Sequence, residues 1–205
     1  MKQKEVCKQY LEKYSPDRAE QLIEKLEHYH TLITEVNSVI NLYSRKTDPN
    51  DLWTHHFLDS LLFLQTDIRF KGKVLDFGTG GGLPGIPIKF FNPDIDLSLL
   101  DARMKKVAAI DEMIEDMGLT NAKGVWSRLE EYVMHKSSVY DFIVCRSVRI
   151  TPEYKPMLLQ LLKPKGKIVL YKSKNLDDLE QFSNKQILDV SHPEIGTRKL
   201  IIIKK

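Results

Sequence analysis

The chain has 205 residues, 42% of them apolar and 29% charged, with a formal net charge of +3. This size fits one medium domain, alone or with an appendage, and the composition predicts a substantial core under an ordinary water-soluble surface. No apolar run reaches the length of a membrane span, residues 1–5 lack the apolar core of a secretory signal, and Cys7 and Cys145 form no Cys-x-x-Cys pair. We therefore expect a reduced, cytoplasmic protein that holds no metal and contacts no membrane.

The first part of the chain, from residue 5 to about residue 64, has the pattern of helices. The apolar residues of segment 22–40 recur at three- and four-residue steps, as on one face of an amphipathic helix. Ser15–Asp17 is expected to begin this main helix, with a serine N-cap and a proline in the first turn. The turn Asp48–Asp51 is expected to start a further helix.

From Lys71 onward the pattern changes to alternating strands and helices. Strands are expected at residues 73–77, 96–100, 122–125, 141–145 and 167–171. Helices are expected between them at residues 84–91, 105–117, 129–134 and 153–162, the second ending at Gly118 and the last at Lys163–Gly166. Two apolar stretches in the tail, residues 186–190 and 199–203, are expected to form an antiparallel edge pair.

These elements predict an α/β protein with a Rossmann-like, seven-stranded, mostly parallel sheet. We interpret residues 1–70 as a helical cap and residues 71–205 as the Rossmann-like domain, the two packed as one unit. In such open sheets, ligands bind outside the carboxyl ends of the strands. The functional residues are therefore expected where the predicted strands end.

The segment Val74–Gly85 is the most informative part of the sequence. It reads Val-Leu-Asp-Phe-Gly-Thr-Gly-Gly-Gly-Leu-Pro-Gly, a short apolar strand that ends in an aspartate and a glycine-dense turn that opens a helix. Glycines such as Gly80 allow positive φ angles and let a ligand approach main-chain N–H groups. The carboxylate of Asp76 would repel the diphosphate of a dinucleotide but attract the ammonium group of S-adenosylmethionine. The turn therefore predicts a methyl-donor site.

Other interpretations of this turn are open at this point. Gly80, Gly82 and Gly85 satisfy G-x-G-x-x-G, although that match alone is weak support for a dinucleotide. No Gly-Lys-Ser/Thr sequence follows, which excludes a P-loop. A glycine-rich turn without any ligand is the remaining alternative.

Polar residues at the ends of the later strands extend the predicted donor site. Asp101 follows the second strand, where a carboxylate can accept both ribose hydroxyls of a nucleoside. Ser127–Glu130 follows the third strand, where an acid or backbone amides can read the edge of an adenine. Arg146 ends the fourth strand. Acids in phase at successive strand ends favour a bound ligand over isolated helix caps.

Several absences narrow the predicted reaction. The residues after the fourth strand, Arg146–Arg149, contain no Asn/Asp-Pro-Pro-aromatic motif of the kind used to methylate exocyclic amines. Cys145 lies inside a strand and is interpreted as a small buried residue rather than a nucleophile. The six histidines have the spacing of neither a zinc site nor a catalytic triad. A nucleophile that needs no deprotonation, such as guanine N7, remains, and alignment of donor and acceptor is then the main catalytic requirement.

The chain resembles the bacterial ribosomal RNA small subunit methyltransferase G family, also called glucose-inhibited division protein B. The similar segments, in order, are Asn41–Leu42, His56–Leu61, Asp76–Pro87, Leu99–Asp101, Ser127–Glu131, Arg146, Leu162–Gly166 and Arg198–Leu200. They cover nearly the whole chain. The Gly-Leu-Pro-Gly-Ile-Pro run together with His-Phe-Leu-Asp-Ser is far more specific than a general methyltransferase glycine turn.

The resemblance implies a class I methyltransferase fold, S-adenosylmethionine as methyl donor, and N7 methylation of one guanine in 16S rRNA. The implied partner is 16S rRNA or the small ribosomal subunit, and basic clusters near the ends of the predicted elements suit such an anionic partner. A monomer is expected. The donor-binding residues then include Gly78, Leu83, Leu129, Glu130 and Arg146, in addition to Asp76, Gly80 and Asp101. Arg146 is the candidate catalytic residue, because a guanidinium at a strand end can meet the donor carboxylate or the RNA.

Two departures from the family pattern keep alternatives open. Ser147–Pro152 is bulkier and more charged than the small residues usual after Arg146, and Ser173 follows Lys172 where glycine is common. Both lie near the expected entry of the substrate base. A methyltransferase acting on another RNA or a small molecule, or a binding protein that has lost catalysis, is therefore also considered.

Overall fold

The computed structural model describes residues 2–205; Met1, included in the predicted helical cap, lies outside them. Its centre is a seven-stranded sheet with strand order β3-β2-β1-β4-β5-β7-β6. The strands are β1 (Lys73–Phe77), β2 (Asp96–Asp101), β3 (Ala122–Trp126), β4 (Tyr140–Arg146), β5 (Leu162–Lys172), β6 (Lys185–Asp189) and β7 (Lys199–Lys204). Strands β1–β5 pair in parallel, and β7 runs antiparallel to both β5 and β6. This confirms the predicted mostly parallel sheet with an antiparallel pair at one edge.

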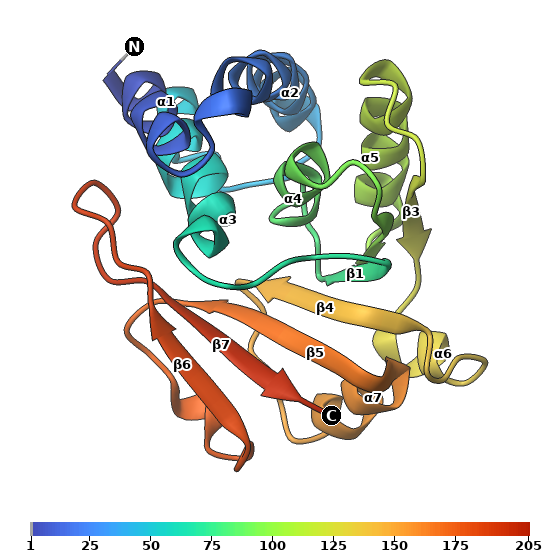
Figure 1. The fold of residues 1–205 in the computed structure, drawn as a ribbon. Coiled ribbons are helices and arrows are strands. Elements are labelled where there is room, and N and C mark those ends of the chain that lie inside the picture. Colours follow the sequence, from blue (N-terminus) through green and yellow to red (C-terminus); the bar gives the residue numbers. More distant parts are fainter. Residues whose placement is uncertain (1) are drawn as a thin grey trace.

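Helices cover both faces of the sheet. They are α1 (Lys2–Tyr14), α2 (Ala19–Val39), α3 (Asp59–Leu61), α4 (Gly85–Phe91), α5 (Met104–Asp116), α6 (Leu129–Val133) and α7 (Tyr154–Leu161). Helices α1–α5 lie over one face, and α6 and α7 lie against the other (Figure 1). Among residues 2–205, no helix combines the length and apolarity needed to cross a membrane.

Alternation along the central strands divides the core between the two faces. In β1, Val74 and Leu75 are both fully buried. Val74 belongs to the apolar cluster that includes side chains of α1, α2 and α4, whereas Leu75 belongs to the cluster that includes side chains of α6 and α7. Because successive strand residues point to opposite faces, a sheet covered on both sides needs an almost continuous apolar run.

The helical segment before the sheet differs in detail from the prediction. Pro16–Arg18 forms a 3₁₀ turn, closed by a 3.1 Å bond from Arg18 N to Ser15 O, and Ser15 makes no side-chain cap. Helix α2 therefore begins later, at Ala19. Near the end of α2, Asn37 Oδ1 accepts hydrogen bonds from the backbone N–H groups of Leu42 and Tyr43 in the following loop. These two bonds tie the loop that follows α2 to the helix, and Leu42 of that loop lies close to Gly80 and Gly81 of the glycine turn.

The helix that follows residue 52 and the start of β5 also differ from the prediction. The Asp48 carboxylate caps the next helical segment, accepting from Asn50 N at 2.8 Å, but Trp53–Leu58 then continues as a π-helix before α3. Residues 163–166, expected to end a helix, belong to β5 instead. Leu162 pairs with Tyr140 across a register shift, and this pairing extends the strand backwards. Gly118 does end α5, with a φ of +61°.

Candidate functional site

The glycine turn lies between the ends of β1 and β2. The N–H of Gly78 donates to Leu100 O at 2.9 Å, and the N–H of Gly80 donates to Asp101 Oδ2 at 3.1 Å. Gly80 has a φ of +60°, a conformation that strains residues with a side chain, and a Cβ there would point toward Leu42 O and the Lys106 ammonium. Hydrogen bonds thus join the turn to β2, and the loop after α2 lies close to the turn at Gly80.

Asp76 lies beneath this turn and is fully buried. Its Oδ2 accepts hydrogen bonds from Thr79 Oγ1 at 2.7 Å and from Gly85 N at 2.8 Å, while its Oδ1 is buried and has no partner among the described residues. Burial raises the pKa of Asp76 to about 6, although the bonds from Thr79 and Gly85 act in the opposite direction. The carboxylate therefore holds the turn in shape and keeps one oxygen without a partner.

A cavity of about 670 Å³ opens above the turn. We call it the glycine cavity; it is lined by Leu42, Tyr43, Ser44, Thr47, His56, Gly78, Thr79, Gly80, Gly81, Leu83, Asp101, Arg103, Lys106, Arg146, Ser147 and Val148. Its volume is in the range of sites that hold cofactors and small molecules. The Asp101 carboxylate lies at its wall, where Oδ1 also accepts from Arg103 N at 2.9 Å.

The predicted donor residues divide into three groups. Gly78, Gly80, Leu83, Asp101 and Arg146 line the glycine cavity together. Asp76 is buried beneath the turn and does not line the glycine cavity.

Leu129 and Glu130 stand at the start of α6, Leu129 buried and Glu130 exposed, and neither lines the cavity. Contact between these two residues and a donor stays a prediction.

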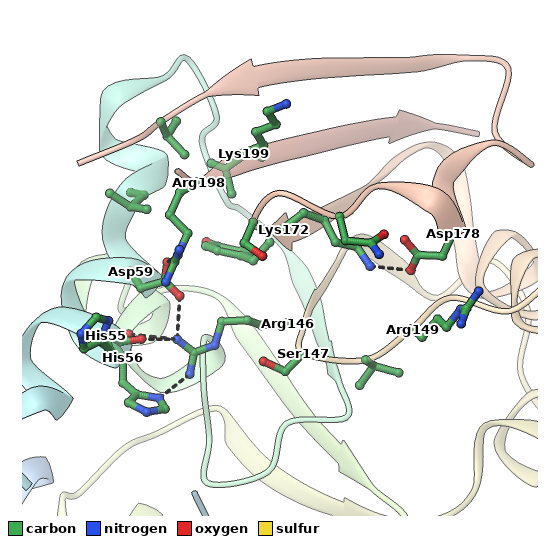
Figure 2. Close-up of a pocket in the computed structure, with 17 residues that line it drawn as sticks. His55, His56, Asp59, Arg146, Ser147, Arg149, Lys172, Asp178, Arg198 and Lys199 are labelled. Atoms are coloured by element: carbon green, nitrogen blue, oxygen red, sulfur yellow. Dashed lines mark hydrogen bonds and ion pairs between the residues drawn. The ribbon is translucent and has the colours of Figure 1, made fainter. Parts of the chain in front are cut away.

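Arg146 is held by the π-helical segment and α3. Its Nη1 donates to Asp59 Oδ2 at 2.9 Å and to the carbonyls of His55 and His56, and its Nη2 lies 2.8 Å from His56 Nδ1 (Figure 2). Asp59 also accepts from Arg198 Nε at 2.8 Å. The Arg146 and Asp59 side chains are only 10% and 7% exposed, so this ion pair is largely shielded from water.

The π-helical segment contributes directly to this arrangement. In Trp53–Leu58 the usual hydrogen-bond spacing is lost, and the N–H of Asp59 donates to both Thr54 O and His56 O. Two successive carbonyls and the following acid thereby meet the single Arg146 guanidinium. Such local π turns are frequent at functional sites.

A second cavity, of about 400 Å³, lies beside the first. We call it the arginine cavity; its charged lining consists of Arg146, Arg149, Lys172, Arg198 and Lys199, with the carboxylates of Asp59 and Asp178. Lys172 forms an ion pair with Asp178, which also accepts from Ile150 N at 2.8 Å (Figure 2). Five cations against two carboxylates give this cavity a net attraction for anions.

The two cavities share one wall. His56, Arg146, Ser147 and Val148 line both of them. Ser147 has a φ of +63°, which is uncommon for a residue other than glycine. A ligand in the glycine cavity and a ligand in the arginine cavity would meet at this wall.

Several residues of this site were not singled out as functional from the sequence. His56, Asp59 and Arg198 appeared only within segments that carry the family resemblance, and Tyr43 and Asp178 carried no signal. Asp59 and Arg198 are 139 positions apart in the chain, so no local pattern could pair them. Within residues 2–205, no group of three or more His, Cys, Asp or Glu side chains is arranged to hold a metal ion.

Two solved structures with a similar fold are described as methyltransferases. A SAM dependent methyltransferase from Aquifex aeolicus aligns over 85% of this chain and 97% of its own, with 16% identity and a TM-score of 0.59. A predicted O-methyltransferase from Agrobacterium tumefaciens aligns over 72% and 80%, with 12% identity and a TM-score of 0.60. At these identities the likeness concerns the fold alone, which is the Rossmann-like fold of class I S-adenosylmethionine-dependent methyltransferases.

Sequence comparison gives the family. The family model described as rRNA small subunit methyltransferase G matches residues 22–198. Proteins named Ribosomal RNA small subunit methyltransferase G are similar: the one from Chlorobium phaeobacteroides is 40% identical over 75% of this chain and 68% of its own. The one from Desulforamulus reducens is 33% identical over 87% and 80%. The chain therefore belongs to the rRNA small subunit methyltransferase G family.

Proposed function

We propose that the protein transfers the methyl group of S-adenosylmethionine to N7 of one guanine in 16S rRNA. Membership of the rRNA small subunit methyltransferase G family carries this proposal. The structure adds a physical reason, because two adjoining cavities of different character share the wall formed by His56, Arg146, Ser147 and Val148. A transferase of this kind needs one site for the donor and one for the acceptor, in contact with each other.

The residues of the glycine cavity suit the methyl donor. Gly80 has no side chain, so a ligand in the cavity can approach the backbone of the turn there. The Asp101 carboxylate at the wall can accept hydrogen bonds from ribose hydroxyls. Asp76 Oδ1 is buried without a partner beneath the turn, and the charge of this carboxylate favours a cationic group above the turn. When bound, the donor supplies a methyl group activated by a sulfonium. We propose donor contacts from Asp76, Gly78, Gly80, Leu83, Asp101, Leu129, Glu130 and Arg146.

The arginine cavity suits the acceptor nucleotide. Its excess of cations attracts the phosphates that flank any RNA base. Guanine N7 carries an available lone pair, so the protein has to position the base rather than remove a proton from it. Arg146, held at the shared wall by Asp59, is the proposed catalytic residue because it faces both cavities.

We propose that the partner is 16S rRNA or the assembling small ribosomal subunit. The protein would bind this partner as a monomer, in the cytoplasm and without a metal ion. The exposed Arg149 side of the arginine cavity is the part of the protein that would meet the surrounding RNA. A modification enzyme that recognises RNA by its phosphates needs no metal for that contact.

The test is mass-spectrometric mapping of methylated nucleosides in 16S rRNA from a strain that lacks this gene. We expect the loss of one N7-methylguanine, restored by the wild-type gene and by Asp94→Ala, an exposed control outside both cavities. Asp101→Ala is expected not to restore it, because it removes the carboxylate that lines the glycine cavity and binds Gly80 N.

Two outcomes would contradict the proposal. Unchanged methylation of 16S rRNA in the deletion strain would reject it outright. Loss of a methyl group from another RNA or from a small molecule would instead favour the alternative acceptor.

A further inference from the structure

His56 occupies the wall between the two cavities. Its side chain lines both, and its ring is held by the Arg146 guanidinium, with Nη2 2.8 Å from Nδ1. The ring also packs at a tilt against Tyr43, with centroids 5.7 Å apart. The imidazole therefore has a defined position at the place where donor and acceptor would meet.

The contact with Arg146 determines which ring nitrogen carries the proton. A guanidinium has donors only, so His56 Nδ1 must be the acceptor of this bond. Burial, the Arg146 charge and the neighbouring His55 lower the pKa of His56 to about 3, so the ring is neutral at physiological pH. A neutral ring whose Nδ1 accepts carries its proton on Nε2. Nε2 makes no hydrogen bond to any of the described residues, so its N–H is available to a ligand.

We propose that His56 is a specificity-determining residue that donates a hydrogen bond from Nε2 to O6 of the acceptor guanine. This inference rests on the proposed function and names how the acceptor base is recognised. Beside N7, guanine presents the acceptor O6, whereas adenine presents the donor N6–H₂ at the same place. A fixed N–H at the shared wall therefore matches guanine and opposes adenine while N7 faces the donor.

The other residues of the shared wall are less suited to this task. Val148 has no polar side-chain atom, and the Ser147 hydroxyl can donate or accept, so it accommodates either purine. Arg146 Nη1 is engaged by Asp59 and two carbonyls. Methylation at N7 also makes the base cationic, and a neutral donor such as His56 does not repel that charge as an additional cation would.

Three substitutions separate recognition of the base from support of Arg146. The Oδ1 of Asn in His56→Asn lies where Nδ1 is and still accepts from Arg146, but no donor remains at the Nε2 position. The longer amide of His56→Gln places a donor near the Nε2 position and loses the acceptor at Nδ1. His56→Phe removes both groups and keeps the ring.

The experiment measures kcat/KM for methylation of small subunits from the deletion strain, with donor affinity measured by calorimetry for each variant. We expect His56→Asn to lower kcat/KM by about tenfold or more, the effect of one lost hydrogen bond, with donor affinity within about twofold of wild type because the contact with Arg146 is kept. His56→Phe should lower kcat/KM at least as much. His56→Gln is expected to keep kcat/KM within about threefold of wild type, because Asp59 and two carbonyls still hold Arg146. The thermal unfolding midpoint of each variant checks that it is folded.

Two results would overturn the inference while leaving the proposed function intact. If His56→Asn is active and His56→Gln is not, His56 serves only to hold Arg146. If all three variants match wild type, His56 has no part in the reaction. Wild-type protein that fails to methylate the subunits would instead overturn the proposed function, and this inference with it.

Discussion

Two charged side chains at the ends of central strands, Asp76 and Arg146, are held by the protein itself. Asp76 binds Thr79 and Gly85 below the glycine turn, and Arg146 binds Asp59 at the shared wall. A charged group that already has partners is fixed in place before any ligand arrives. Such preorganisation lowers the cost of positioning a donor and an acceptor.

Asp76→Asn is expected to remove one component of the pH dependence of stability. Burial raises the pKa of Asp76 in the folded state to about 6, above the ordinary aspartate value of 3.8, so the folded protein binds a proton that the unfolded chain releases between these values. This contribution to the free energy of unfolding is fully present below about pH 4 and is lost as pH rises through 6, by about 3 kcal/mol. Urea denaturation of wild type and Asp76→Asn from pH 4 to pH 8 measures the difference.

The wild-type advantage over Asp76→Asn should therefore decline with rising pH and become constant above pH 6. Asp94→Asn, at an exposed turn, serves as the control and should follow the wild-type curve. Parallel curves for wild type and Asp76→Asn would show that Asp76 does not titrate in this range.

At the scale of elements, the join between the glycine turn and α4 sets the geometry of the donor site. A Cβ at Gly85 would lie 2.7 Å from Asp76 Oδ2 and 2.7 Å from Leu99 Cδ2, closer than real Cβ contacts. The start of α4 is thus packed directly on β1 and β2. Tyr29 of α2 adds a hydrogen bond to Gly81 O, which connects the turn to the helices on the same face.

Gly85→Ala is expected to displace the start of α4 and the turn with it. We expect a loss of about 1–3 kcal/mol in the free energy of unfolding, as for other overpacked sites, and at least a tenfold loss of S-adenosylmethionine affinity. Gly118→Ala is the matched control, because nothing lies within 4 Å of a Cβ there and only its φ of +61° opposes the substitution. That variant should lose about 1 kcal/mol and keep donor affinity. Equal donor affinity for the two variants, by calorimetry, would contradict this account.

The elements themselves were largely predictable from local patterns. The five parallel strands and the tail pair lie within a few residues of the predicted ranges, because apolar runs and glycine turns are local properties. The exceptions are places where contact with another element determines the local structure. Pairing with Tyr140 draws Leu162 into β5, and Trp53–Leu58 becomes a π-helix where its carbonyls meet Arg146.

At the scale of the whole molecule, both cavities lie where the helical segment meets the sheet. The loop at Leu42–Tyr43 and the residues His56 and Asp59 supply one side, and the strand ends supply the other. One apolar cluster runs from α1 and α2 through to β1, β2 and β4, so the segments share a core. The domain boundary predicted between residues 70 and 71 stays a prediction.

S-adenosylmethionine is expected to stabilise the whole protein against heat, because a ligand bound only by the folded state shifts the unfolding equilibrium. At a free concentration of one hundred times Kd the gain is about 2.7 kcal/mol, which raises Tm by about 5–10 °C for a chain of this size. Differential scanning calorimetry with and without the donor measures this shift. A dinucleotide at the same concentration is the control and should leave Tm unchanged; a shift with the dinucleotide alone would contradict the donor assignment.

The alternating α/β architecture, the glycine turn and the acids at the strand ends could be predicted from local sequence, because each depends on residues that lie close together in the chain. Its resemblance to the family gave the expected donor and acceptor. The packing of distant segments was needed to show that Asp76 lies below the turn, that Asp59 joins Arg146 to Arg198, and that His56 stands between two cavities. Burial and long-range ion pairs depend on which distant segments pack together, and no local pattern of residues records that choice.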